Sequence, residues 1–135
     1  MARLAKEGAR QDKFEAWAKF TLGTMPLESI GRWLRRHYSF RPEAEEVLRT
    51  VDWMLNDFAT AGYVEGDCDD ASIFVAAVSL VLGYRVRLVA IRYRDPLEFE
   101  HVYAEVFDGR WVIVDLTVPE GTRYNVLERM VLDVA

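Results

Sequence analysis

The feature that most limits the possible folds is a helix-length apolar segment that begins directly after a cluster of acids. Residues 71–82 read Ala-Ser-Ile-Phe-Val-Ala-Ala-Val-Ser-Leu-Val-Leu. A helix that is apolar on nearly every side belongs in the interior of a protein, and this one is too short to span a bilayer. We therefore expect a fold built around a buried central helix over residues 67–82.

The only cysteine of the chain, Cys68, lies at the predicted start of this helix, in Glu65-Gly66-Asp67-Cys68-Asp69-Asp70. The N-terminus of a helix carries about half a positive charge and unpaired N–H groups, which favour the thiolate, the nucleophilic form of cysteine. We interpret Cys68 as a nucleophile. The alternative is a small buried hydrophobic residue, the usual role of a lone cysteine.

Three carboxylates, on Asp67, Asp69 and Asp70, flank the cysteine. Negative charge opposes a thiolate, but these acids also make the thiol hard to bury. We expect Asp67 or Asp69 to cap the helix. Asp70 is expected to pair with an arginine that follows the helix, Arg85 or Arg87.

Two strand-like segments downstream, residues 100–106 and 110–116, supply the groups that a cysteine nucleophile needs. The first contains His101 and the second contains Asp115. A histidine can accept and return the proton of a thiol, and a carboxylate on its far side fixes the tautomer and the orientation of the ring. The sequence therefore predicts a triad of Cys68, His101 and Asp115.

The relative position of His101 and Asp115 depends on the loop between their strands. A two-residue Asp-Gly turn would place the two side chains on opposite faces of the sheet. A three-residue loop with Gly109 in the left-handed conformation instead pairs Val106 with Arg110. Counting back from that pair, His101 lies directly opposite Asp115, with Cβ atoms about 4.5–5.5 Å apart. The triad thus requires the longer loop.

The remaining pattern places helices first and antiparallel strands later, which predicts an α+β fold. Residues 1 to about 22 form one amphipathic helix in this interpretation, residues 27–37 a second, and a third starts at Pro42 and could divide near Thr50. A further strand covers residues 84–94. Residues 124–134 are compatible with a last strand or a short helix.

Composition excludes some classes of function. The 135 residues suffice for one domain with a core. The net charge of −5 argues against nucleic-acid binding. We therefore interpret the local basic cluster of Arg32, Arg35 and Arg36 as a solvated face. One cysteine permits no internal disulfide. The N-terminal sequence shows no signal-peptide pattern, and we expect a cytoplasmic protein with no membrane partner.

Three segments carry a resemblance to a known family: Gly66-Asp67-Cys68-Asp69-Asp70, Glu100-His101-Val102-Tyr103-Ala104-Glu105-Val106 and Trp111-Val112-Ile113-Val114-Asp115-Leu116-Thr117. Together they resemble the transglutaminase-like superfamily over roughly residues 38–118. The resemblance implies a papain-like core in which Cys68 is the nucleophile, His101 the base and Asp115 the orienting acid. Leu116 stands where many members have proline.

An oxyanion hole is the other part of such a site. The backbone N–H of Cys68 is one candidate donor. Trp33 and Tyr63, upstream of the cysteine, carry suitable N–H and O–H groups, and Trp33 is loosely similar to the oxyanion-hole tryptophan of animal members. We expect a single domain over 1–135, with a helical part (1–37), the core (38–118) and a C-terminal extension (119–135).

The resemblance implies a cysteine acyl-transfer enzyme, a peptidase, amidase or protein cross-linker, that acts on a protein or peptide through a thioester. No cofactor is expected, and no metal, because zinc sites use more Cys or His ligands. Small members with a Gly-Asp-Cys-Asp-Asp motif resemble those encoded by tailed phages and prophages. The alternative function is therefore a non-catalytic assembly protein, such as a virion component with a vestigial triad.

Overall fold

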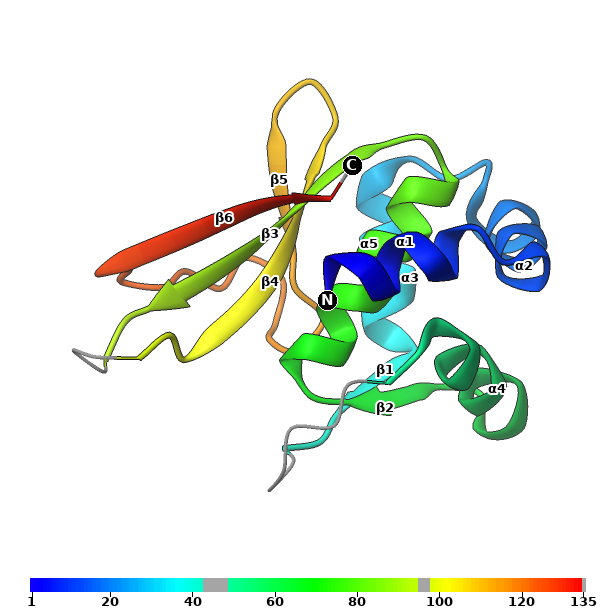
Figure 1. Cartoon of the computed structure of the whole chain (residues 1–135), viewed down its shortest axis with the longest axis horizontal. Coiled ribbons are helices and arrows are strands. Elements are labelled where there is room, and N and C mark those ends of the chain that lie inside the picture. The colour runs from blue at the N-terminus through cyan, green and yellow to red at the C-terminus, as the bar shows by residue number, and fades with distance from the viewer. Residues whose placement is uncertain (43–48, 95–97, 135) are drawn as a thin grey trace.

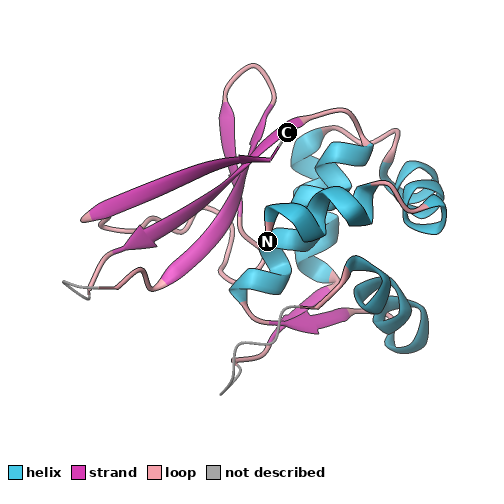
Figure 2. Ribbon diagram, viewed as in Figure 1, coloured by secondary structure: helices cyan, strands magenta, loops and turns pink. Residues whose placement is uncertain are grey.

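The computed structural model of the chain describes residues 1–42, 49–94 and 98–134. Its helices are α1 (Ala2–Ala9), α2 (Asp12–Leu22), α3 (Leu27–Arg36), α4 (Val51–Ala61) and α5 (Cys68–Val81). Its strands are β1 (Tyr38–Phe40), β2 (Val64–Gly66), β3 (Arg85–Arg92), β4 (His101–Phe107), β5 (Trp111–Val114) and β6 (Glu128–Val134). The predicted α+β fold is confirmed, with the helices gathered on one side of a four-stranded antiparallel sheet (Figures 1 and 2).

The predicted central helix is α5, which is buried along the whole stretch from Asp70 to Ser79. Helix α1 packs on one side of it, and strands β3 and β4 pack on another. The two buried serines do not leave unpaired hydroxyls: Ser72 donates to the carbonyl oxygen of Cys68 and Ser79 to that of Val75, both at 2.7 Å. Burial of this apolar segment therefore fixes where the residue at its start, Cys68, must lie.

The sheet has the strand order β5-β4-β3-β6, and every neighbouring pair is antiparallel. Successive side chains of a strand point to opposite faces. One face packs with α5 in the main core, and the other carries a smaller apolar cluster. The main-core face includes Val86, Leu88, Ala104, Val106 and Val134, whereas the smaller cluster comprises Val89, Ile91 and Tyr103, with Tyr93 and Tyr124 against them.

The expectation of one helix over residues 1–22 is wrong. The chain bends at Arg10 and Gln11, and α2 starts after Gln11 adopts an extended conformation. The short residues Ala5 and Gly8 are buried, and a Cβ atom on Gly8 would overlap the side chain of Val51 in α4. Helix α1 packs against both α5 and α4 and takes its own direction. The tertiary contact thus overrides a periodicity that would allow one continuous helix.

The helix predicted to start at Pro42 falls partly on residues outside the described ranges. Helix α4 begins at Val51, where the Thr50 side chain accepts a hydrogen bond from the backbone N–H of Trp53 at 3.3 Å.

The segment 124–134, for which the sequence allowed either a strand or a short helix, ends in the strand β6. In the described part of the chain, no helix has the length and apolar character needed to cross a membrane.

Candidate active site

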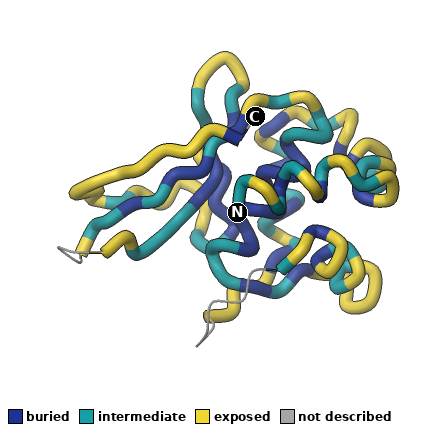
Figure 3. The backbone as a smooth tube through the Cα atoms, in the orientation of Figure 1, coloured by how far each residue is buried: buried dark blue, intermediate teal, exposed yellow. Residues whose placement is uncertain are grey.

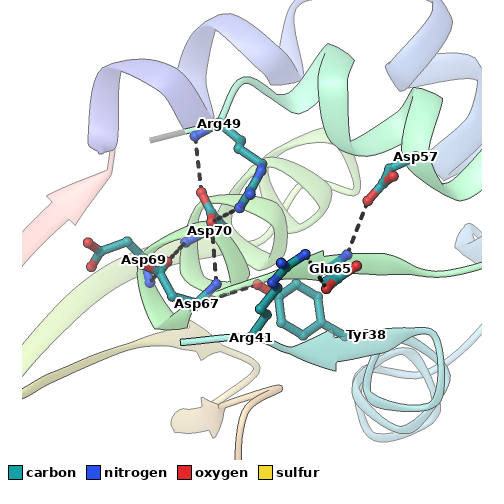
Figure 4. Close-up of polar contacts among 8 residues, drawn as sticks. All are labelled: Tyr38, Arg41, Arg49, Asp57, Glu65, Asp67, Asp69 and Asp70. Atoms are coloured by element: carbon teal, nitrogen blue, oxygen red, sulfur yellow. Dashed lines mark hydrogen bonds and ion pairs between the residues drawn. The ribbon is translucent and has the colours of Figure 1, made fainter. Parts of the chain in front are cut away.

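The start of α5 is built by a reciprocal cap between two of the three acids. The carboxylate of Asp67 accepts hydrogen bonds from the backbone N–H groups of Asp69 and Asp70 at 3.0 and 3.1 Å. In return, the Asp70 carboxylate accepts the N–H of Asp67 at 3.3 Å. Of the two residues expected to cap the helix, Asp67 is the one that does so. Figure 4 shows the Asp69 side chain pointing away from this cluster.

Asp70 is fully buried and forms an ion pair with Arg49 (Figure 4). The backbone N–H of Arg49 donates to one oxygen at 3.0 Å and the guanidinium to the other at 2.8 Å. The expected pairing with Arg85 or Arg87 is wrong, because Arg87 donates instead to Glu105 on the neighbouring strand at 2.7 Å. Burial raises the pKa of Asp70, and the hydrogen bonds from Arg49 oppose this effect.

Steric crowding explains why the Gly-Asp-Cys motif has a glycine at position 66. A Cβ atom on Gly66 would lie 2.7 Å from the Asp70 carboxylate and 2.8 Å from the Tyr38 hydroxyl, so no larger side chain fits without displacement. Tyr38 donates to the carbonyl oxygen of Asp67 at 2.7 Å. Burial and the nearby Asp70 and Asp67 carboxylates raise the pKa of Tyr38, which keeps this donor protonated.

Strand β2 brings the cysteine to the site. It pairs in parallel with β1, matching Tyr38 with Val64 and Phe40 with Gly66. The sequence indicates only a loop over residues 61–66, because a three-residue strand carries too little periodicity to be recognised. The pairing fixes the backbone two residues before Cys68, which is half-buried.

His101, the first residue of β4, contacts both other members of the predicted triad. Its Nε2 lies 2.6 Å from Oδ2 of Asp115, and the two side chains are only 11% and 4% exposed. Burial lowers the pKa of His101, but hydrogen bonds with Asp115 and with the thiol of Cys68 outweigh it and raise the pKa to about 9. Because Asp115 occupies Nε2, Nδ1 is the ring nitrogen left for the thiol.

The loop between β4 and β5 has the predicted length and conformation, but the predicted strand register is wrong. Gly109 has φ of 77° and the N–H of Asp108 bonds to the Arg110 carbonyl. The first pair, however, is Phe107 with Trp111, whose rings pack at 5.3 Å. The register is therefore shifted by two residues from the predicted pairing of Val106 with Arg110.

A shift of two residues leaves every side chain on its expected face. Continued by one residue beyond β5, the observed register puts Asp115 opposite Tyr103 and diagonal to His101. Diagonal neighbours are still within reach of long side chains. His101 and Asp115 therefore share the predicted face of the sheet although their pairing differs from the predicted one.

Asp115 is held from several sides. Its Oδ1 accepts the N–H of Thr117 at 3.0 Å and the Thr117 hydroxyl at 2.7 Å. Arg35 donates to its backbone carbonyl at 2.9 Å. Burial raises the pKa of Asp115, but the hydrogen bonds from His101 and Thr117 outweigh it and hold the pKa below its usual range. The carboxylate is therefore ionised beside the imidazole.

Tyr124 is a site residue that sequence reasoning missed. Its ring centroid lies 5.2 Å from that of His101 and 6.5 Å from that of Tyr103, on which it stacks. Its hydroxyl is 3.5 Å from the Asp115 carboxylate. Tyr124 covers the histidine from a segment with no helical or strand periodicity, so the sequence contains no signal that marks it.

The two upstream oxyanion candidates lie in different surroundings. The Trp33 ring stacks on His37 at 3.9 Å and packs against Trp17 and Phe58. Tyr63 is 42% exposed and immediately precedes β2. Their roles stay predictions.

The backbone at the helix start offers a donor of its own. Asp67 binds the N–H groups of Asp69 and Asp70, whereas none of the described residues accepts a hydrogen bond from the N–H of Cys68. Within the described ranges, no three His, Cys, Asp or Glu side chains are arranged to hold a metal ion. The side chains that the site brings together are a thiol, an imidazole and a carboxylate.

A thiol at a helix start, beside an imidazole and a carboxylate from an antiparallel sheet, defines a papain-like α+β protein. The model of the transglutaminase-like superfamily matches residues 23–116, and the chain belongs to this superfamily. A crystal structure of "a putative cysteine protease" from Cytophaga hutchinsonii shares the fold, with a TM-score of 0.60 and 19% identity over 82% of this chain. The chain spans 38% of the length of that protein. No curated protein sequence matches it.

Proposed function

We propose that the protein is a cysteine-dependent acyl-transfer enzyme, a peptidase, amidase or protein cross-linker, with Cys68 as nucleophile, His101 as acid and base, and Asp115 as the orienting acid. The observation that supports it best is the pair of His101 Nε2 and Asp115 Oδ2 at 2.6 Å, with the Cys68 thiol near enough to the imidazole to help raise its pKa. Membership of the transglutaminase-like superfamily and the fold shared with a protein described as a cysteine protease support it further.

The raised pKa of His101 favours an imidazolium at neutral pH, the charge that a neighbouring thiolate needs. In the proposed reaction, Sγ of Cys68 bonds to a substrate carbonyl carbon, and the negative charge moves to the carbonyl oxygen near the N–H of Cys68. The C–N bond then breaks as the leaving amine takes the proton from Nδ1 of His101. A thioester remains.

The second half of the reaction reverses the role of His101. The neutral imidazole removes a proton from water or from an amine as that group attacks the thioester carbon, and the Cys68 thiolate leaves. Asp115 stabilises each imidazolium state without taking a proton itself. Water as the acceptor gives a peptidase or amidase, and an amine gives a cross-linker.

The test does not require a known substrate. We expect the purified protein to react with iodoacetamide at pH 7 much faster than glutathione does, and His101→Ala to remove most of this excess. His37→Ala, which changes the other histidine of the chain, is the matched control and should alkylate at the parent rate.

Turnover is the second readout. In the presence of a peptide mixture and hydroxylamine, an active enzyme forms peptide hydroxamates through its thioester, and Cys68→Ala forms none. A thiol no more reactive than glutathione, with no hydroxamate formed, would overturn the proposal. It would favour a non-catalytic assembly role for the fold.

A further inference from the structure

Strand β6 (Glu128–Val134) is an edge of the sheet along its whole length. It pairs with β3 on one side, through seven residue pairs from Val86 with Val134 to Arg92 with Glu128. On its other side, no strand of the described chain pairs with it. An edge strand presents a row of N–H and C=O groups that another strand can bind. Figure 3 shows the strand exposed over most of its length.

The side chains of β6 are unusual for an edge. Met130, Val131 and Leu132 are 58%, 44% and 54% exposed, although all three are apolar. Proteins usually protect an edge strand with charged side chains, above all lysine, or with proline, a bulge or a very short length. The charged residues of β6, Glu128, Arg129 and Asp133, lie towards its two ends and leave its centre apolar. This strand has seven residues, a regular register, and neither lysine nor proline. These properties are those of a strand that binds another strand.

The charges of β6 indicate which strand it binds. In two antiparallel copies related by a two-fold axis perpendicular to the sheet, opposing residues lie on the same face. A register centred on Val131 places Met130 opposite Leu132 of the second copy, twice. It also places Arg129 opposite Asp133 of the second copy, twice. At the centre of the strand, apolar residues thus oppose apolar residues, and each arginine opposes an acid. At the two ends, Glu128 opposes Val134, which is buried, and Glu128 already has Arg92 as an ion-pair partner.

The neighbouring registers are poorly matched. A register centred on Met130 sets Arg129 against Val131 and Glu128 against Leu132. A register centred on Leu132 sets Val131 against Asp133. Because a shift must keep each side chain on its face, these are the nearest alternatives, and neither opposes Arg129 to an acid. Each also sets a charge against an apolar residue near the centre of the strand. The sequence of β6 is therefore self-complementary in one register.

We propose that the protein forms a homodimer through antiparallel pairing of two β6 strands, which joins the two sheets into one continuous sheet. Arg129 is 45% exposed at its side chain and uses Nη2 to donate to Glu105, so its other N–H groups can face the second copy. His101 lies on β4, two strands from this edge, and dimerisation leaves the candidate active site open.

Sedimentation velocity and light scattering over a concentration series test this inference. The mass should rise from the 15.6 kDa of one chain to twice that value as concentration increases. Met130→Lys and Leu132→Lys should each raise the dissociation constant about 100-fold, because the two-fold axis places every substitution in the interface twice. Leu127→Lys is the matched control, since Leu127 is also 58% exposed but precedes the strand.

A charge exchange makes the test specific for the register. Arg129→Asp and Asp133→Arg should each weaken the homodimer by setting like charges opposite each other, and a mixture of the two variants should form a heterodimer. Circular dichroism and thermal melting establish that each variant is folded. A parent protein that stays monomeric, a heterodimer that does not form, or a Leu127→Lys effect equal to that of Met130→Lys would overturn the inference. None of these results depends on acyl transfer.

Discussion

Asp115 reaches His101 along a diagonal of the sheet, and the Oδ2–Nε2 distance of 2.6 Å is achieved although Tyr103 occupies the position directly opposite Asp115 in the register. The diagonal approach places Asp115 just beyond the end of β5, where Thr117 donates to its carboxylate and Arg35 donates to its backbone carbonyl. The position of Asp115 relative to His101 therefore depends on the contacts of the residues that follow β5 as well as on the pairing of β4 with β5.

Asp115→Asn should remove the electrostatic interaction between residue 115 and His101. The amide keeps the size of the carboxylate but removes the charge that stabilises the imidazolium, so the pKa of His101 should fall from about 9 towards 6.5. Turnover should fall by about 10²- to 10⁴-fold, as expected when a triad loses its orienting acid. An NMR titration of the imidazole measures the first effect, with the His37 signal as internal reference. An unchanged His101 titration would contradict this prediction.

The stability of the fold should decrease at alkaline pH. The pKa of His101 is raised in the folded protein, so protonated His101 stabilises the fold fully below pH 6.5, and this contribution is lost as the pH rises through about 9. Urea denaturation at pH 6, 7.5 and 9.5 measures the loss. His101→Gln should show a flatter profile over the same range. If the stability of the parent protein depended on pH as little as that of His101→Gln, protonation of His101 would not contribute to the stability of the fold.

Asp70→Ala should be strongly destabilising. It removes the buried partner of Arg49 and half of the helix cap, and breaking a buried ion pair costs about 3–5 kcal/mol. Asp70→Asn retains acceptors for the cap and should lose less. Glu28→Ala, which breaks an ion pair with Arg32 that is 52% and 68% exposed, should stay within about 0.5 kcal/mol of the parent. Urea denaturation compares the three, and equal effects of Asp70→Ala and Glu28→Ala would contradict the prediction.

Gly66→Ala should also destabilise the fold, by about 1–3 kcal/mol, because its methyl group would overlap the Asp70 carboxylate. It should slow the alkylation of Cys68 by displacing the start of α5. Gly31→Ala is the matched control: its Cβ would meet nothing closer than 3.7 Å, and alanine favours a helix over glycine by about 1 kcal/mol. Thermal melting that ranks the two variants in the opposite order would refute the steric explanation.

The parts of the fold predicted from the sequence are those with strong local patterns. The apolar segment after Cys68 identified α5, and the alternation around His101 and Asp115 identified β4 and β5. The register could not be predicted, because it depends on the packing of Phe107 against Trp111 across the loop.

The missed parts of the site all depend on contacts between distant segments. Arg49, which binds Asp70, lies 21 residues before it, and no periodicity connects the two. Tyr124 reaches His101 from a segment without a pattern. The break between α1 and α2 follows from packing against α5, which the amphipathic spacing alone does not reveal.

Helix α5 belongs to the helical side of the molecule and carries Cys68, whereas His101 lies on β4 of the sheet and Asp115 directly follows β5. The interaction between the Cys68 thiol and the His101 imidazole therefore crosses the interface between the helices and the sheet. A substitution in the side chains that pack α5 against β3 and β4 should therefore change the alkylation rate of Cys68. The rate measured at this one sulfur atom would then report on the packing of the core.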